Sequence, residues 1–352
     1  MSEAVEIQRP RVSLISWLIK GTVALAASAG AFWWAVQGVD LAEVTQQLKG
    51  SDLRILILFL VVQLVIHGVR VVRWGLLVRP LGDVSPRAIF AAASVGFPAA
   101  FFLPFRLGEF IRPVMLARSG VPFAAAMASV VVERIADGVV NLGLFFIFLT
   151  MLPETAPIPD DLRTFSMAAL VVFGGGLVCL IMACVAKRPA LAITDRLLSP
   201  ISPTFAAKIM GLMETFIDGV MVLRTPGRIV SFVALSLVFW LSNGAITWVL
   251  AQSYVDGLPF LAGPFSISVV VFAVMIPAGP AFAGTLEAGI KFGMAPFGVL
   301  ANSALVVAVA FHAVQLIQMA IIAGVGFMAA ERRQAPWTPP PVEGAAPPPG
   351  DD

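Results

Sequence analysis

The chain has 352 residues, of which 59% are hydrophobic and only 12% are charged, and its formal net charge is +2 at pH 7. Soluble domains carry about 25% charged residues, so this composition excludes a soluble globular domain, a disordered chain and a disulfide scaffold. The small net charge excludes a nucleic-acid partner, and the composition places the protein in a lipid bilayer.

Apolar runs of about 20 residues predict helices that span a membrane. Lys20 interrupts the first run and its hydrophobicity continues past Ala29, which favours an uncleaved anchor over a cleaved signal peptide. The six predicted spans are 12–36, 53–78, 123–152, 166–186, 229–250 and 302–330.

Two further apolar regions, 88–116 and 260–298, are interrupted by proline and glycine and contain charged residues. Each contains a proline, then a glycine, then a glutamate at the start of an apolar helix. These residues are Pro104, Gly108 and Glu109 in the first region, and Pro277, Gly284 and Glu287 in the second. Non-helical backbone at membrane depth is tolerated only where protein buries it or water reaches it, so both regions are predicted to be re-entrant helical hairpins.

Segment 191–223 is not predicted to cross the membrane. Apolar residues recur at steps of three and four from Phe205 to Leu223, and Lys208, Glu214 and Asp218 occupy much of the rest of the helical wheel. This pattern predicts one amphipathic helix in the membrane interface.

Lysine and arginine in short loops indicate the cytoplasmic side. Basic residues gather at the N-terminus, at 79–87, 187–208 and 224–228, and at the C-terminus, which places both termini in the cytoplasm. Arg70, Arg73 and Arg79 are interpreted as snorkelling residues that set this topology.

The resulting fold class is an all-α polytopic membrane protein. It has about six full spans, two oppositely oriented re-entrant hairpins in an inverted repeat, and one interfacial helix. We expect a cytoplasmic segment at 1–11, a transmembrane domain at 12–333 and a disordered, proline-rich cytoplasmic tail at 334–352.

Charged side chains at membrane depth are costly and usually carry function. Arg106, Glu109 and Arg112 are spaced by three, Glu133 and Asp137 lie one turn apart beside Arg134, and Glu287 and Lys291 form an i, i+4 pair. We predict that these eight residues bind the substrate in one cluster where the two hairpins meet. The alternative is that they form structural ion pairs only.

No metal or cofactor is expected. Cys179 and Cys184 lie in a different apolar run from either His67 or His312, so the sequence assembles no zinc site, and it contains no phosphate-binding glycine loop with its lysine.

The residues from Gly96 through Pro104-Phe-Arg-Leu-Gly-Glu-Phe-Ile-Arg112 to Val132-Glu-Arg-Ile-Ala-Asp137 resemble the first signature of the lysylphosphatidylglycerol synthase transmembrane (flippase-like) family. The stretch from Pro277 to Glu287 is similar to the second signature, and the likeness extends over residues 14–330. Phe105 replaces the glycine expected after Pro104, and the second signature is longer than expected. Both departures affect the expected choice of headgroup.

The resemblance implies a multi-pass protein of the bacterial inner membrane that moves a phospholipid or a lipid-linked headgroup between leaflets. Because only a short tail follows Arg333, we expect no aminoacyl-transfer domain and no enzymatic activity. Two alternatives stay open. One is an intramembrane transferase with Glu109 or Asp137 as general base, and the other is a non-catalytic partner of a lipid-modifying enzyme. A homo-oligomer is also compatible with the sequence.

Overall fold

A computed structural model of the protein describes residues 40–154, 170–200, 202–221, 225–274 and 279–331, together with positions 33, 156, 164, 167 and 168. Within these ranges the regular structure is helical, as predicted. The first predicted span at 12–36 lies outside the described residues apart from position 33. Segment 1–11, Pro277 and the predicted tail also lie outside them.

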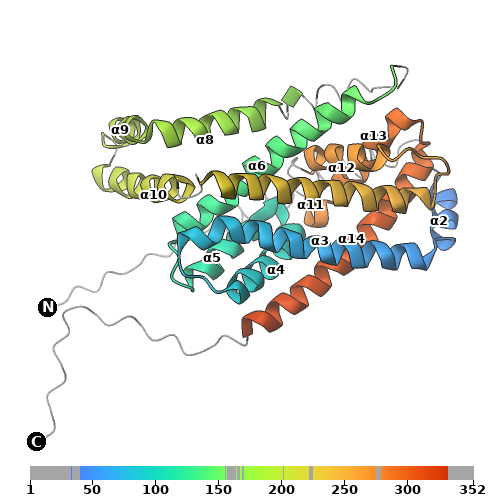
Figure 1. Ribbon diagram of the computed structural model, residues 1–352, viewed down its shortest axis with the longest axis horizontal. Helices are drawn as coiled ribbons and strands as arrows, with labels where there is room; N and C mark the ends of the chain where they lie inside the picture. The colour runs from blue at the N-terminus through green and yellow to red at the C-terminus, as the bar shows by residue number, and fades with distance from the viewer. Residues whose placement is uncertain are drawn as a thin grey trace, which may run out of the picture.

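Three long helices form the frame of the molecule: α3 (Leu53–Val78), α11 (Pro226–Gln252) and α14 (Ala301–Glu331). Each is long and apolar enough to cross a membrane, which confirms the spans predicted at 53–78, 229–250 and 302–330. A fourth long helix, α6 (Phe123–Thr150), matches the helix predicted at 123–152. The short α2 (Leu41–Lys49) lies at the opposite end of the molecule from α5, α9 and α10 (Figure 1).

The first broken region consists of α4 (Pro86–Phe102), the 3-10 segment η2 (Pro104–Phe110) and α5 (Ile111–Ala117). Its two ends pack in one cluster with the last turns of α3, because Ala88 and Leu116 share a core with Trp74 and Leu77. A Cβ on Gly108 would lie 2.0 Å from the carbonyl carbon of Ala99, so only glycine lets η2 approach α4 this closely. The chain therefore returns to the end of α3 from which it left.

The second broken region consists of α12 (Ala262–Ala273), η5 (Pro280–Phe282), α13 (Thr285–Met294) and η6 (Ala295–Phe297). Its two ends also lie together, since Ala262 and Met294 share a core with Leu250 at the end of α11 and with Phe59 near the start of α3. The two broken regions therefore begin and end at opposite ends of α3.

The interrupted segments of the two regions meet between these ends. Phe101 of α4 and Phe282 of η5 pack in one cluster with Met319 of α14, with their ring centroids 5.7 Å apart. Arg106 of η2 donates a hydrogen bond to the carbonyl oxygen of Val274, just after α12, at 3.1 Å. The contact predicted between the two broken regions is thus present.

The remaining helices differ from the prediction. Segment 191–223, expected as one amphipathic helix, contains two helices, α9 (Lys187–Leu198) and α10 (Pro203–Met221), because Pro200 and Pro203 interrupt the helical pattern. Lys187 of α9 forms ion pairs with two residues of α10, Asp218 at 2.5 Å and Glu214 at 3.1 Å, and the hydrogen bond that it donates to Asp218 raises the pKa of Lys187. Of the span predicted at 166–186, the structure describes a π-helical turn, η3 (Leu170–Gly174), and α8 (Gly175–Val185).

Candidate functional site

A fully buried arginine of α3 joins two carboxylates of α6. Arg73 has no exposed surface, and its two terminal nitrogens bind Asp137 at 2.5 and 3.1 Å and Glu133 at 3.1 Å. Glu133 and Asp137 are one helical turn apart, so both carboxylates face the same guanidinium group. Ser236 of α11 accepts a fourth, longer bond from Arg73 at 3.3 Å.

The first broken region adds a second buried arginine to these carboxylates. Arg112 at the start of α5 pairs with the other oxygen of Glu133 at 2.5 Å. Its side chain lies directly against Gly96 of α4, where an added Cβ would come within 2.2 Å of the Arg112 Cγ. Gly96, at the start of the first signature, therefore makes room for Arg112, sixteen residues later in the chain.

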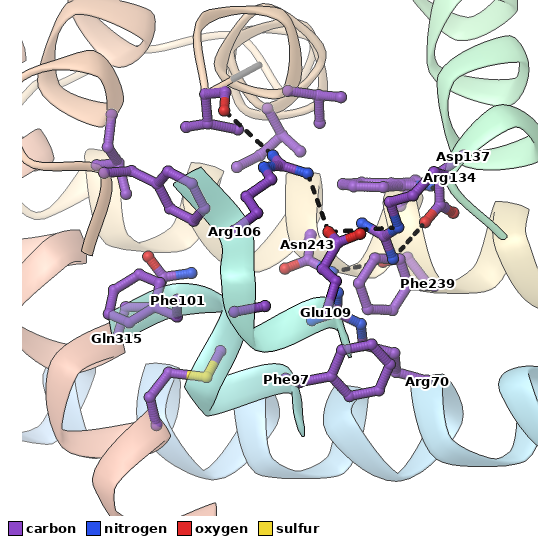
Figure 2. A pocket seen from close by; sticks show the side chains of 18 of the residues that line it. Arg70, Phe97, Phe101, Arg106, Glu109, Arg134, Asp137, Phe239, Asn243 and Gln315 are labelled. Atoms are coloured by element: carbon purple, nitrogen blue, oxygen red, sulfur yellow. Dashed lines mark hydrogen bonds and ion pairs between the residues drawn. The ribbon is translucent and has the colours of Figure 1, made fainter. Parts of the chain in front are cut away.

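A row of alternating charges leads from this buried group to a cavity (Figure 2). Arg134 pairs with Glu133 at 3.2 Å and Asp137 at 3.3 Å, and its Nε lies 3.9 Å from Glu109. Glu109 in turn pairs with Arg106 at 3.4 Å. The structure thus brings together six of the eight predicted site residues, through side chains from η2, α5 and α6.

The cavity has a volume of about 410 Å³ and lies where the two broken regions meet. Such a volume is within the range of small-molecule sites. Its wall combines aromatic and aliphatic side chains, including Phe97, Phe101, Phe239 and Phe282, with a polar set. The polar residues are Arg70, Arg106, Glu109, Arg134, Asp137, Trp240, Asn243 and Gln315.

The backbone at both tips of the broken regions is unusual. Arg106 in η2 has φ of 55°, and Ala281 and Phe282 in η5 each have φ of 58°. These values lie in the left-handed region, which is costly for residues other than glycine and is commonly found at functional sites. Arg106 and Phe282 both line the cavity, with the Arg106 guanidinium 5.1 Å from the Phe282 ring.

The interpretation of Arg70 and Arg73 as snorkelling residues was wrong. Arg70 lines the cavity and stacks at 3.6 Å on the ring of Phe97, and Arg73 is enclosed by α6 and α11. Only Arg79, at the end of the helix, is exposed. Gln63, His67, Arg70 and Arg73 are spaced by four, three and three, so one polar face of α3 points into the bundle, and this spacing is the signal that sequence reasoning missed.

Glu287 has a different partner from the one predicted. Its carboxylate pairs with Nδ1 of His312 on α14 at 2.5 Å and accepts the backbone N–H of Gly284 at 2.7 Å. The glutamate thus caps the first turn of α13, as the glycine-glutamate pattern predicted. Glu287 and Lys291 are not among the residues that line the cavity, and Glu287 pairs with His312 rather than with an arginine of the cluster.

The arginine cluster has an excess of positive charge. Five arginines (70, 73, 106, 112 and 134) surround three carboxylates (Glu109, Glu133 and Asp137), and three of these arginines line the cavity beside two of the carboxylates. An excess cation in an apolar bundle is stabilised by an anion. In the described part of the chain, no group of three or more histidine, cysteine, aspartate or glutamate side chains is placed to hold a metal ion.

Comparison with known families gives a match that contains the site residues described above. The family model described as the lysylphosphatidylglycerol synthase transmembrane region matches residues 21–323. The chain belongs to this family. The match contains all eight predicted site residues and confirms the resemblance seen in the two signatures. Membership of the family makes this chain a membrane protein with a lipid-related function.

One curated relative is Glycosyltransferase AglD of Haloferax volcanii. It is 25% identical to this family member over 349 residues, and the alignment covers 90% of this chain and 54% of the relative. The chain therefore spans about half the length of that relative.

Proposed function

We propose that the protein transports a lipid with an anionic headgroup, either a phospholipid or a lipid-linked phosphate, between the leaflets of the membrane. The observation that carries this proposal is the cavity of about 410 Å³ at the meeting point of the two broken regions, lined by three arginines and two carboxylates. The headgroup would occupy this polar cavity, while the acyl chains stay in the surrounding bilayer.

The roles of the residues follow from their positions. Arg70 and Arg106 would bind the phosphate, because guanidinium groups match phosphate oxygens bidentately. Arg134 also lines the cavity, but it is already paired with Glu133 and Asp137. It would therefore contribute positive charge to the cavity without exchanging its partners for the phosphate. Glu109, between Arg106 and Arg134, would release Arg106 toward the incoming anion and take it back afterwards.

The layout of the chain supports a transport path. The two broken regions start from opposite ends of the bundle and meet at the cavity, which is the arrangement of transporters built from inverted repeats. In the membrane, both regions would be re-entrant and would enter from opposite faces. The protein would lie in a bacterial inner membrane with both termini in the cytoplasm.

The test is lipid translocation in proteoliposomes with headgroup-labelled phosphatidylglycerol and an external quencher. We expect protein-dependent loss of the quencher-protected signal with the wild type. We expect this loss to slow at least tenfold in Arg106→Gln, because a charge-assisted hydrogen bond contributes about 1.5–3 kcal/mol. Arg87→Gln, an exposed arginine of the same broken region, should transport normally. Equal rates with and without protein would contradict the proposal.

Cysteine labelling tests the orientation. After Cys179 and Cys184 are replaced by alanine, a cysteine at Asp256, between α11 and α12, should react with an impermeant maleimide from outside the cell. A cysteine at Ser199, between α9 and α10, should react only after the membrane is opened. The reverse pattern would reject the assigned direction of the two broken regions.

A second candidate function is suggested by the name of the relative, a glycosyltransferase. In that case the cavity would hold a lipid-linked acceptor, and Glu109 or Asp137 would act as general base. The purified protein would then move a radiolabelled sugar from a sugar nucleotide to lipid, and Arg106→Gln proteoliposomes would still exchange lipid at the rate of the wild type. We favour transport, because a cavity lined by three arginines supports the binding of an anionic headgroup and this binding needs no second substrate.

A further inference from the structure

The pair formed by Glu287 and His312 is buried, yet it is not part of the arginine cluster. Each residue is less than 10% exposed, and His312 Nδ1 lies 2.5 Å from the Glu287 carboxylate. The other Glu287 oxygen accepts the backbone N–H of Gly284, so both carboxylate oxygens are occupied. In the described structure, Nε2 of His312 is buried and has no hydrogen-bond partner.

With these contacts, the pair can bind one additional proton. When His312 donates its Nδ1 proton to ionised Glu287, the pair has a net charge of −1, and Nε2 has a free lone pair. A second proton on the pair makes it neutral, either as imidazolium with carboxylate or as imidazole with carboxylic acid. The buried Nε2, which has no hydrogen-bond partner in the described structure, is the position at which the pair can bind and release this proton.

Few other charges face the pair. Neither α12 nor the stretch of α4 beyond Arg87 contains a titratable side chain, and on α14 the other such residue is Glu331 at its far end. On α3, His67 is bonded to Ser94 and Arg70 lies in the cavity. Near the start of α3, Arg54 is exposed, and α2 contributes Glu43 and Lys49. Arg106 reaches the Phe282 ring from η2, and Lys291 follows Glu287 one turn later on α13.

The pair lies behind the wall of the cavity. His312 is between Phe311 and Gln315 along α14, and both of these neighbours line the cavity. The ring of Phe101, another wall residue, lies edge-on to the His312 ring with centroids 6.1 Å apart. The buried oxygen of Gln315 also lacks a hydrogen-bond partner within the described ranges, and Gln315 is one turn from His312 on the same helix. The Gln315 amide therefore provides a polar group in the cavity wall one turn away from His312.

We propose that Glu287 and His312 form a proton-binding site that is coupled to anion binding in the cavity, so that the proton is a second substrate of the transporter. This inference rests on the proposed function. A neutral pair leaves the cavity more positive than a pair with a charge of −1, so an anionic headgroup favours the doubly protonated pair. By thermodynamic reciprocity, protonation must favour the headgroup by the same factor.

The sign of the pH dependence follows. Anion affinity should rise as pH falls, by up to about tenfold per pH unit, because the binding of one proton is linked to the binding of one anion. For each anion that binds, the protein should take up a fraction of a proton, and one proton is the upper limit.

The experiment is calorimetric titration of the detergent-solubilised full chain with dihexanoyl phosphatidylglycerol in two buffers of different ionisation enthalpy. The difference in heat between the buffers measures the protons taken up per lipid bound. We expect uptake with the wild type and none with His312→Gln, which should still bind the lipid. His67→Gln is the matched control, since His67 is the other of the two histidines of the chain and is also buried.

The outcomes separate this inference from the proposed function. Proton uptake that persists in His312→Gln, or that disappears in His67→Gln, would overturn the proton site while leaving transport intact. If His312→Gln does not fold, Glu287→Gln must lose the uptake, and uptake retained there overturns the site equally. Absence of lipid binding by the wild type would overturn both proposals.

Discussion

Replacing Arg73 by methionine is expected to lower the free energy of unfolding by about 3–5 kcal/mol, because it leaves buried carboxylates without their cation. Arg73 is the one residue of α3 that binds both Glu133 and Asp137, and all three are inside the protein. Methionine fills much of the same volume, so the loss reports the charge rather than a cavity. Arg112 and Arg134 would still neutralise Glu133, but Asp137 would retain only Arg134 among the ion pairs of the cluster.

Unfolding by sodium dodecyl sulfate in mixed micelles measures this change. Arg79→Met is the matched control, because Arg79 directly follows α3 and is exposed, and we expect it to alter the unfolding free energy by less than about 0.5 kcal/mol. A stability of Arg73→Met equal to that of the wild type would show that Arg73 is dispensable to the fold.

Replacing Arg70 by methionine is expected to have the opposite pattern, with anion binding lost and stability kept. Arg70 is one turn before Arg73 on α3, but it lines the cavity and contacts the rings of Phe97 and Phe239 rather than forming a described ion pair with a carboxylate. Methionine keeps the contact with Phe97. Loss of one charge-assisted hydrogen bond should weaken the binding of phosphatidylglycerol about 10–150-fold.

The measurement is lipid affinity and translocation rate in Arg70→Met, with the unfolding midpoint recorded on the same sample. The midpoint should stay the same or rise, since the variant removes a cation that has an incomplete set of partners, with its Nε buried and unbonded in the described structure. Arg70→Lys should recover part of the affinity, because a lysine restores the charge without the bidentate geometry. Undiminished affinity in Arg70→Met would remove Arg70 from the site.

Local sequence was sufficient for the long elements. The runs at 53–78, 229–250 and 302–330 are apolar over more than 20 residues, so each must form a helix in lipid whatever its neighbours are. The breaks at Pro104 and near Gly284 were also readable, because proline and glycine interrupt helices through their own backbone chemistry. The division of 191–223 was missed because the apolar spacing that begins at Phe205 was extended back over residues 191–204, where Pro200 and Pro203 mark the break.

Sequence also identified the charged residues of the first broken region and of α6, because ionisable groups in an apolar run are rare and costly. It could not assign their partners. Glu287 has Lys291 at helical spacing on its own helix, yet the tertiary fold pairs it with His312, 25 residues later on a different helix. From the sequence, Arg73 is predicted to lie near the end of a span and to extend toward water. In the structure it is enclosed, because α6 and α11 pack around it.

The amino-acid sequence by itself determined that this chain is a membrane protein, where its long helices run and which segments are broken. Those properties depend on the transfer of side chains and backbone from water to lipid, which each segment decides alone. Only the tertiary structure decided which arginines are structural and which face the cavity. The role of an arginine depends on which carboxylates lie within hydrogen-bonding distance of it. For Arg73 these carboxylates are 60 or more residues away along the chain, and only the packing of the helices brings them close.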